Sequence, residues 1–401
     1  MTKPLAGVRV LDLSNIIAGP LCTYQLVQLG ADVIKVERPG TGDLSRKMGA
    51  DPAMGRRNMG ASFLSSNAGK RSITLNLQQE RGREIFRALV KDAHVVFENF
   101  RPGVMARLGL GYDDLKKTRP GLVYCAVSGF GQDGPLSKRP AYDQIIQGYS
   151  GLMSVTGTEE TGPFRAGYVV CDTMGAMTAA FAIVAALYRA QATGEGAFVD
   201  VSMLDASLVT MAAWVISNYV NAGDVPRPLG NESHSAAPSG TFPTKDGQIN
   251  LVNNEQKQFE TTCDVLGRLD LKTHPLYADR DDRLKHRKAL RKELEATLKT
   301  RTGAEWEKAF SAAGVPAGRI YSIPEILEHP HIKSRGIVKT FPKAGHEGRD
   351  VTVSTLGFRL VGEELDLDRP PPELGQDSRD VLRELGLDDA AIEALRRDGT
   401  I

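Results

Sequence analysis

The first 130 residues alternate between strand-like and helix-like segments, and this alternation constrains the fold more than any other feature. Residues Val8–Leu13 and Asp32–Glu37 have the composition of strands, and Pro20–Leu29 between them has that of a helix with proline in its first turn. Three more strand-like runs follow, separated by helical segments such as Glu80–Val90: Ile73–Leu77, Val95–Phe97 and Leu122–Val127. The pattern predicts an α/β domain with a parallel or mostly parallel sheet covered by helices.

This pattern changes after a helix predicted from Leu204 to about Val220. Residues 221–238 are rich in Gly, Pro and Asn, and they lead to a pair of strands at Gly240–Phe242 and Gln248–Val252. Charged amphipathic helices follow near residues 255–313. These segments predict a second, smaller α+β domain.

The charge balance limits the classes of partner. Lys and Arg number 50 and Asp and Glu 49, so the net charge of +1 creates no bulk field for nucleic acid or an anionic membrane. The longest apolar stretch, Ala176–Leu187, is shorter than the roughly 20 residues of a spanning helix, and Met1–Pro4 lacks a signal-peptide layout. We expect a soluble, cytoplasmic protein without nucleic-acid or membrane partners.

The cysteines carry no recognisable framework. Cys22, Cys125, Cys171 and Cys263 are scattered with no C-x-x-C pair, which argues against a disulfide frame and a zinc site. We therefore expect no metal.

Asp172 is the candidate nucleophile. It follows a strand-like apolar run, Val169–Cys171, and precedes a helix of small and apolar residues from Gly175 to Leu187. A carboxylate in such surroundings is poorly solvated, so its charge is costly unless it is satisfied or used. The alternative is a helix N-cap, a position that Asp favours.

The loops beyond the carboxyl ends of the strands are where an α/β sheet binds its ligands. The first βαβ unit lacks the G-x-G-x-x-G fingerprint, which disfavours an ordinary NAD site. At the end of the second strand Glu37 is followed by Arg38; an acid there suits a ribose hydroxyl and an arginine suits a ribose phosphate, as in coenzyme A. Glycines between Gly129 and Gly134 either expose backbone N–H groups to an oxyanion or form a tight loop.

Several ordered motifs carry a resemblance to a known family. They are Val10–Leu13 with Ala18–Pro20, Leu29–Gly40, Asn67–Ser72, Glu98–Gly103, Ser128–Pro135 and Leu374–Ser378. From near residue 4 to the C-terminus the chain resembles the class III CoA-transferases, which include formyl-CoA transferase and carnitine CoA-transferase. The resemblance implies a Rossmann-like large domain, a smaller α+β domain and an interlocked homodimer. The implied boundaries are 1–200 for the first part of the large CoA-binding domain, 201–222 for a linking helix, 223–329 for the small domain and 330–401 for the return to the large domain.

The resemblance also implies the roles of individual residues. Asp172 is then the nucleophile. The implied CoA-binding residues are Ile17, Ala18, Arg38, Leu75, Leu77, Asn99, Arg101, Arg107, Lys138 and Arg139. In formyl-CoA transferase the loop before Ala18 carries a histidine and a glutamine where this chain has Asn15 and Ile17, which disfavours a formyl/oxalate substrate pair.

The implied activity is transfer of CoA from an acyl-CoA donor, best succinyl-CoA, to a free dicarboxylic acid through an aspartyl anhydride and thioester. A related alternative is an α-methylacyl-CoA racemase, but Ala141-Tyr142-Asp143 stands where the racemases have Gly-His-Asp, and tyrosine is a weak base at neutral pH. A non-catalytic CoA-binding protein with a structural Asp172 is the alternative from another class. His234 is either a solvated loop residue or a partner for the distal carboxylate of the acid.

Overall fold

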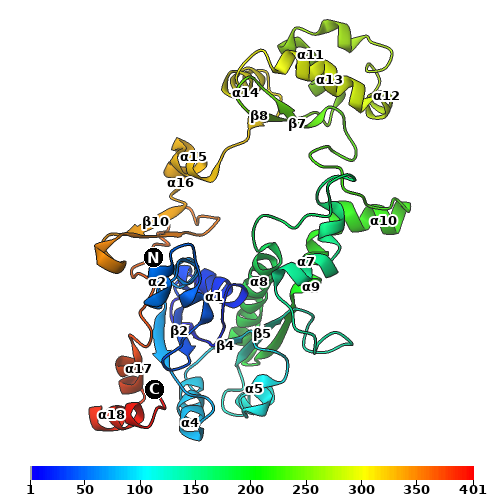
Figure 1. The fold of residues 1–401 in the computed structure, drawn as a ribbon. Helices are drawn as coiled ribbons and strands as arrows, with labels where there is room; N and C mark the ends of the chain where they lie inside the picture. Colours follow the sequence, from blue (N-terminus) through cyan, green and yellow to red (C-terminus); the bar gives the residue numbers. More distant parts are fainter. Residues whose placement is uncertain (1) are drawn as a thin grey trace. The chain divides into compact units, whose positions relative to one another are not determined.

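The computed structural model describes residues 2–401 and divides the chain into two compact units (Figure 1). The first unit comprises the chain up to Leu152, Arg165–Val225 and Arg335–Ile401. The second comprises Met153–Phe164 and Pro226–Ser334.

The first unit is built on a six-stranded parallel sheet with the strand order β3-β2-β1-β4-β5-β6. The strands are β1 (Arg9–Asp12), β2 (Asp32–Glu37), β3 (Arg71–Thr74), β4 (Val95–Glu98), β5 (Val123–Ser128) and β6 (Ala197–Ser202). Val10 of β1 pairs with Val33 on one side and with Val95 on the other. The prediction of an α/β domain with a parallel sheet is confirmed. The strand order reverses between β1 and β4, and such a switch point is where these sheets bind ligands.

Helices cover both faces of this sheet. Val10 and Leu11 are successive residues of β1, and they belong to different apolar cores. The Val10 core contains α1 (Ala18–Gln28) and α8 (Val170–Thr193), and the Leu11 core contains α4 (Glu80–Val90) and the C-terminal helices α17 (Ser378–Glu384) and α18 (Asp389–Arg397). The remaining helices of this unit are α2 (Pro52–Arg56), α3 (Ala61–Leu64), α5 (Val104–Arg107), α6 (Tyr112–Leu115), α7 (Asp143–Tyr149), α9 (Met203–Thr210) and α10 (Ser217–Ala222).

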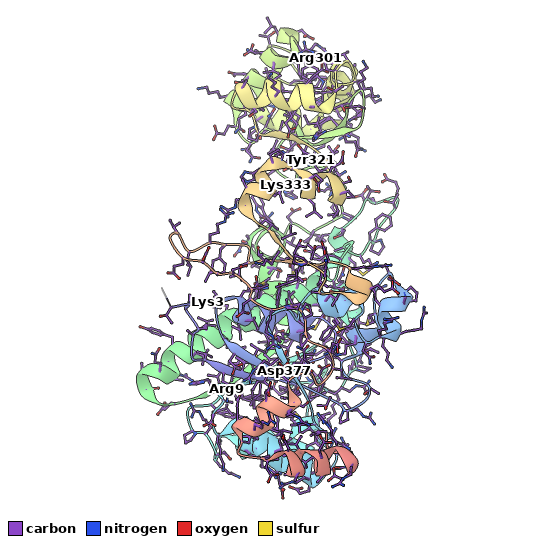
Figure 2. The ribbon with its side chains drawn as sticks, turned by 90° about the vertical axis from the view of Figure 1, so that its left-hand side faces the viewer. Lys3, Arg9, Arg301, Tyr321, Lys333 and Asp377 are labelled. Atoms are coloured by element: carbon purple, nitrogen blue, oxygen red, sulfur yellow. The ribbon has the colours of Figure 1, made fainter. Side chains whose placement is uncertain are left out.

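Asp377, labelled in Figure 2, attaches the C-terminal segment to the edge of the sheet. Its carboxylate accepts a hydrogen bond from the N–H of Ser72 in β3 (2.7 Å), and its own N–H donates to the carbonyl of Ser72 (2.8 Å). Asp377 therefore uses its side chain to extend the sheet rather than to cap α17. A two-stranded antiparallel sheet, β10 (Val338–Phe341) and β11 (Val351–Ser354), precedes this segment in the chain.

The region around Asp172 differs from the sequence prediction. Residues Val169–Cys171 do not form a strand; α8 already begins at Val170, and Asp172 is its third residue. Three residues are too few to distinguish the periodicity of a helix from that of a strand, so the apolar run alone does not reveal the helix. The helix predicted from Leu204 to Val220 is broken into α9, a π-helical stretch at Ala212–Ile216 and α10.

Helix α8 is long and apolar. Its 24 residues meet the length and composition of a membrane-spanning helix, with a mean hydropathy of 1.7 over the best window, so the prediction that no segment reaches that length is wrong. The prediction counted only the uninterrupted run Ala176–Leu187, whereas Val170–Gly175 and the residues after Leu187 extend the same helix. Core helices of soluble proteins meet the same criterion, and a third of the window is buried in the protein.

The second unit combines a three-stranded antiparallel sheet with helices. Strands β7 (Ser239–Pro243), β8 (Gln248–Val252) and β9 (Ala317–Arg319) form the sheet, and the first two are the predicted pair. Its helices are α11 (Gln256–Leu266), α12 (Arg280–Lys285), α13 (Arg287–Leu298), α14 (Gly303–Ala312), α15 (Ile323–Glu328) and most of α16 (Pro330–Arg335). Residues 153–164 join this unit through a bridge between Thr158 and Leu229; the sequence did not set this short segment apart.

Candidate active site

Two asparagines join the strand ends at the switch point. The N–H of Asn15, after β1, donates to Oδ1 of Asn99, after β4 (2.8 Å). Nδ2 of Asn99 donates back to the carbonyl of Asn15 (2.9 Å). The side chain of Asn99 therefore uses both of these hydrogen bonds to hold the backbone of the loop that follows β1, at the point where the strand order reverses.

That loop has an unusual backbone conformation held by buried charges. Ile16 has φ 70°, a left-handed value that is strained for a β-branched residue. Its N–H donates to Oδ1 of Asp43 (2.9 Å), and Lys35 pairs with Oδ2 of Asp43 (2.9 Å). The ammonium of Lys35 also donates to the carbonyl of Ser14 (2.8 Å). Fully buried charges therefore hold the backbone on the N-terminal side of the strained residue, at the Ser14 carbonyl and the Ile16 N–H.

A second buried ion pair lies under the same loop. Asp12 and Lys70 are fully buried and 3.0 Å apart. Burial would raise the pKa of Asp12, but the charges of Lys70 and Lys35 hold it well below its usual range. Burial lowers the pKa of Lys70 to about 8, although Asp12 acts in the opposite direction. Asp12 therefore stays ionised at neutral pH.

Glu37 does not have the role that the sequence suggested for an acid at the end of β2. It is buried, its carboxylate oxygens accept from Nε and Nη2 of Arg46 (both 2.7 Å), and one of them also accepts from Ser72 (2.7 Å). Burial would raise the pKa of Glu37, but the bonds from Arg46 keep it below its usual value. Glu37 is thus not available to a ribose hydroxyl, whereas Arg38 next to it is exposed.

A large cavity lies at the carboxyl ends of β1 to β4. It is an open cavity of about 1490 Å³, and it brings together Arg38, Leu75 and Leu77 of the predicted CoA-binding set. Lys47 and Phe100, which the sequence did not single out, line it as well. The cavity therefore combines two cations with an apolar wall.

A neighbouring cavity of about 950 Å³ contains Asp172. The predicted residues that line it with Asp172 are Ile17, Ala18, Asn99, Arg101 and Arg139. Asn15 and Phe100 line both cavities, so the two adjoin one another. Among the described residues that line them, neither Arg107 nor Lys138 appears; Arg107 ends α5, whose first residue, Val104, lines the larger cavity.

Asp172 occupies the first turn of α8, and Val169 is the N-cap residue, so the N-cap interpretation of Asp172 is wrong. Burial and the negative charge of Asp143 raise the pKa of Asp172 to about 7. The carboxylate is therefore held in an environment that disfavours its charge, which makes it a candidate functional group.

Asp143, the first residue of α7, was not predicted as a site residue. Its Oδ1 accepts from the N–H groups of Cys171 (2.7 Å) and Asp172 (3.2 Å). The local signal for Asp143 in the sequence is the stretch Ala141–Asp143, whose middle residue differs from that of the racemases. A contact between residues 29 positions apart cannot be found from local patterns.

The glycine-containing loop after β5 lies partly on the cavity wall. Of its described residues, Ser128 and Gly129 line the Asp172 cavity, and the N–H of Gln132 is held by Asp200 (2.9 Å). Oγ of Ser128 is buried and has no hydrogen-bond partner among the described residues.

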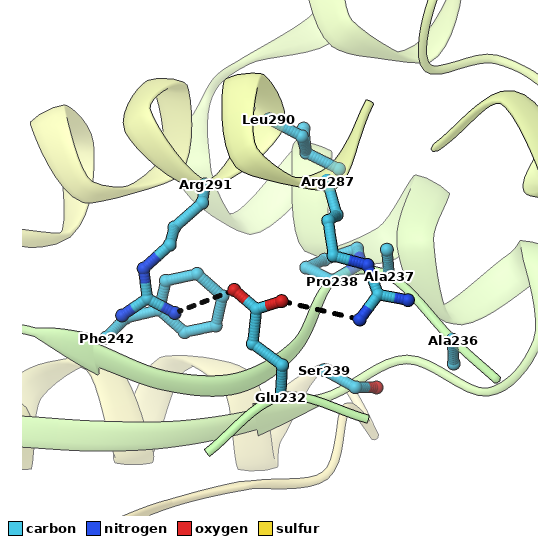
Figure 3. Close-up of a pocket in the computed structure, with 9 residues that line it drawn as sticks. All are labelled: Glu232, Ala236, Ala237, Pro238, Ser239, Phe242, Arg287, Leu290 and Arg291. Carbon is cyan, nitrogen blue, oxygen red and sulfur yellow. Dashed lines mark hydrogen bonds and ion pairs between the residues drawn. The ribbon is translucent and has the colours of Figure 1, made fainter. Parts of the chain in front are cut away.

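The second unit has its own cavities. In one of about 270 Å³, Glu232 lies between Arg287 (3.3 Å) and Arg291 (3.7 Å), so both cations already face a carboxylate (Figure 3). His234 lines another, together with charged residues of both signs. Of the side chains that the structure describes, no three His, Cys, Asp or Glu residues gather in a way that could hold a metal ion.

Known proteins are similar to this chain in sequence and in fold. The CoA-transferase family III matches residues 5–378. The succinyl-CoA:glutarate CoA-transferase of Mus musculus is 36% identical over 402 residues, which cover 100% of this chain and 90% of that protein. The acetyl-CoA:oxalate CoA-transferase of Acetobacter aceti is 38% identical over 336 residues, 84% of this chain and 85% of that protein.

The fold is also that of a solved structure. A CAIB/BAIF family protein from Brucella suis superposes with a TM-score of 0.85 at 33% identity, over 96% of this chain and 100% of the other. With a parallel sheet of this order and a family match over nearly the full chain, the protein belongs to CoA-transferase family III and is a CoA-transferase.

Proposed function

We propose that this enzyme moves CoA from succinyl-CoA to a free dicarboxylic acid, with Asp172 as the nucleophile. The observation that carries the proposal is the single cavity that holds Asp172 together with Arg101 and Arg139. A dicarboxylic acid presents one carboxylate to the reaction and needs a cation for the other. The name of the mouse relative, which acts on glutarate, supports the same class of acceptor.

Coenzyme A would occupy both cavities. Arg38 and Lys47 line the larger cavity, where the ribose phosphate of CoA would find two cations. The pantetheine arm would pass Asn15 and Phe100, which line both cavities, and bring the thioester to Asp172. In this arrangement Arg38, Leu75 and Leu77 would contact CoA, and Asn99 would hold the loop beside it.

The proposed reaction balances without a proton or ATP. The Asp172 carboxylate attacks the thioester carbonyl, the C–S bond breaks and CoA leaves as a thiolate with the electron pair. The thiolate attacks the aspartyl carbonyl of the mixed anhydride, which releases succinate and leaves CoA as a thioester on Asp172. The acceptor carboxylate then attacks this thioester and expels the thiolate again. Attack of the thiolate on the acceptor's acyl carbon in the second anhydride gives the new acyl-CoA and restores Asp172.

The cavity favours these steps over racemisation. Removing and replacing a proton at an α-carbon needs two bases, and the described lining residues include Asp172 and Tyr142 but no histidine. Ser128 and Gly129 line the cavity of Asp172, so the backbone at the end of β5 lies where an oxyanion would form during acyl transfer.

Exchange assays test this proposal. Succinyl-CoA is offered with paired acids of similar length, such as glutarate and pentanoate, and acyl-CoA products are separated by chromatography. We expect exchange with dicarboxylic acids and a much lower kcat/KM for monocarboxylic ones. Equal rates would contradict the assignment of the acceptor class, and loss of the proton at the α-carbon of a 2-methylacyl-CoA without exchange would favour the racemase alternative.

We further propose a homodimer in which a second copy covers α8, in the interlocked arrangement that the family resemblance implies. Phe181 and Tyr188 on α8 are 77% and 79% exposed, and Val209 and Trp214 of the next helices are also exposed. Such an apolar face needs a partner. Light scattering of the purified protein, without detergent, should give twice the mass of 43.4 kDa; a stable monomer would contradict the proposal.

A further inference from the structure

Asp143 is tied to the turn that carries Asp172. Its carboxylate is buried, and Oδ1 accepts from the backbone N–H groups of Cys171 (2.7 Å) and Asp172 (3.2 Å). The first N–H groups of any helix lack partners within the helix. A side chain from α7 thus supplies the acceptor for the first turn of α8 that a capping residue would otherwise provide.

Gln147 completes this connection. Its Nε2 donates to Oδ2 of Asp143 (2.6 Å), and its Oε1 accepts from the N–H of Ala166 (2.8 Å). Gln147 is fully buried. Asp143 and Gln147, one turn apart on α7, therefore hold the chain on both sides of residues 167–170, and the position of the Asp172 backbone follows from theirs.

The charge of Asp143 also acts on Asp172. The charged and titratable groups that line the Asp172 cavity are Arg101 after β4, Arg139 before α7 and the exposed Tyr142. The adjacent Cys171 thiol is buried, which raises its pKa and keeps it neutral. Burial and the charge of Asp143 raise the pKa of Asp172 to about 7, so Asp143 is the group whose charge opposes ionisation of Asp172.

The balance changes when Asp172 reacts. When Asp172 is a free carboxylate, it and Asp143 form a pair of like charges in a poorly solvated site, and their repulsion costs free energy. An acylated Asp172, whether anhydride or thioester, is neutral and carries no such repulsion. The neighbouring charge therefore raises the energy of the free nucleophile but not that of the covalent intermediate.

We infer that Asp143 is a positioning residue of the transfer reaction: it fixes the turn that carries Asp172, and its charge favours the acylated over the free form of Asp172. The inference rests on the proposed function, in which Asp172 is the nucleophile. It assigns to Asp143 a task in the reaction that a purely structural helix cap would not have.

The test compares Asp143→Asn with the wild type. Asparagine keeps an acceptor for the two N–H groups but removes the charge, together with the acceptor for Nε2 of Gln147. A matched control is Asp113→Asn, the same change at an exposed residue of α6. Two quantities are measured: the pH dependence of kcat/KM, and the equilibrium between succinyl-CoA plus free enzyme and succinate plus the Asp172–CoA thioester, followed at pH 8 by mass spectrometry without acceptor.

In Asp143→Asn the acidic limb of the pH profile should move to lower pH by roughly one unit, the smaller end of the effect of a neighbouring charge. The equilibrium constant for acylation at pH 8 should fall by about tenfold, because a shift of one pH unit corresponds to a factor of ten. Asp113→Asn should change neither. Gln147→Met, which loosens the turn and leaves the charge, should lower kcat without moving the limb.

These measurements separate the two proposals. If the wild type forms no adduct on Asp172, the proposed nucleophile is wrong and the role of Asp143 falls with it. If the wild type forms the adduct and Asp143→Asn matches it in both measurements, the role of Asp143 alone is wrong. Should Asp143→Asn fail to fold, Asp143→Glu keeps the charge and displaces the turn; unchanged turnover in both Asp143→Glu and Gln147→Met would overturn the positioning role.

Discussion

Asn99 and Asn15 exchange two hydrogen bonds across the point where the strand order of the sheet reverses, at 2.8 and 2.9 Å. The side chain of Asn99 serves the backbone of the loop after β1, which lines both cavities of the candidate site. Any effect of Asn99 on CoA would therefore act largely through the shape of this loop.

Replacing Asn99 with Ala should weaken CoA binding. Two net hydrogen bonds contribute about 1 to 3 kcal/mol, or roughly a five- to hundredfold change in Kd. Calorimetric titration with CoA measures the change. Asn221→Ala, at an exposed asparagine of α10, is the matched control and should bind CoA as the wild type does. Unchanged affinity in Asn99→Ala would mean that the loop keeps its conformation without this pair.

Removing only one partner of the buried ion pair Asp12–Lys70 should lower the free energy of unfolding. Lys70→Met removes the cation paired with the buried Asp12 carboxylate and leaves it the charge of Lys35 and the bonds from Ser14 and Thr23. Removing one partner of a buried pair costs about 3 to 5 kcal/mol. Urea denaturation followed by tryptophan fluorescence and circular dichroism measures the loss.

The double variant Asp12→Leu with Lys70→Met removes both charges and should recover much of that stability. A Lys70→Met protein as stable as the wild type would show that Lys35 alone neutralises Asp12. A double variant less stable than Lys70→Met would contradict the view that the uncompensated charge causes the loss.

Most of the sheet was predictable because β1, β2, β4 and β5 are largely buried and rich in apolar residues. Strand β3 (Arg71–Thr74) starts two residues before the predicted run Ile73–Leu77 and ends three residues before it does. Strand β2 and helix α4 have the predicted bounds, and the two strands after Pro238 were also found. The strand predicted at Val169–Cys171 is wrong for the opposite reason: a run of three residues carries no period. Within it the N–H of Cys171 bonds to Asp143, and that of Val170 bonds to the carbonyl of Tyr168.

The candidate site was predictable only in part. The carboxyl ends of β1 to β4 follow from the topology, so the loops that carry Arg38 and Asn99 could be identified without a structure. The contacts of the individual side chains could not be predicted in this way. Glu37 is occupied by Arg46, nine residues later, and Asp143 reaches Asp172 across 29 residues. Such pairings depend on packing between elements and leave no local pattern.

The raised pKa of Asp172 predicts a stability that depends on pH. Burial, and then the charge of Asp143, raise it from 3.8 to about 7. The folded state thus binds this proton more tightly than the unfolded state, so the contribution of Asp172 to stability is fully present below about pH 4 and is lost as the pH rises through 7. Asp172→Asn does not titrate and should gain stability over the wild type as the pH rises.

Thermal unfolding of the two proteins at pH 5.5 and pH 8 measures this effect. The melting temperature of Asp172→Asn minus that of the wild type should be larger at pH 8. Asp113→Asn should not show this trend, because its carboxyl is exposed and a bond from Lys116 lowers the pKa of Asp113. A difference that is the same at both pH values would mean that Asp172 ionises in the folded protein as it does in the unfolded chain.

Arg139 and Lys138 are adjacent cations, and the family resemblance implies that both bind CoA. Arg139 lines the cavity of Asp172, and Lys138 is not among its described lining residues. If Arg139 binds the distal carboxylate of the acceptor, Arg139→Gln should raise the KM for glutarate by roughly ten- to a hundredfold, the value of a charge-assisted hydrogen bond. The KM for pentanoate, which has no second carboxylate, should hardly change. Lys138→Gln is the matched control and should leave the ratio of the two KM values as in the wild type. If instead both variants weaken succinyl-CoA and leave that ratio unchanged, the two residues act on CoA phosphate, and the cation for the acceptor must be Arg101.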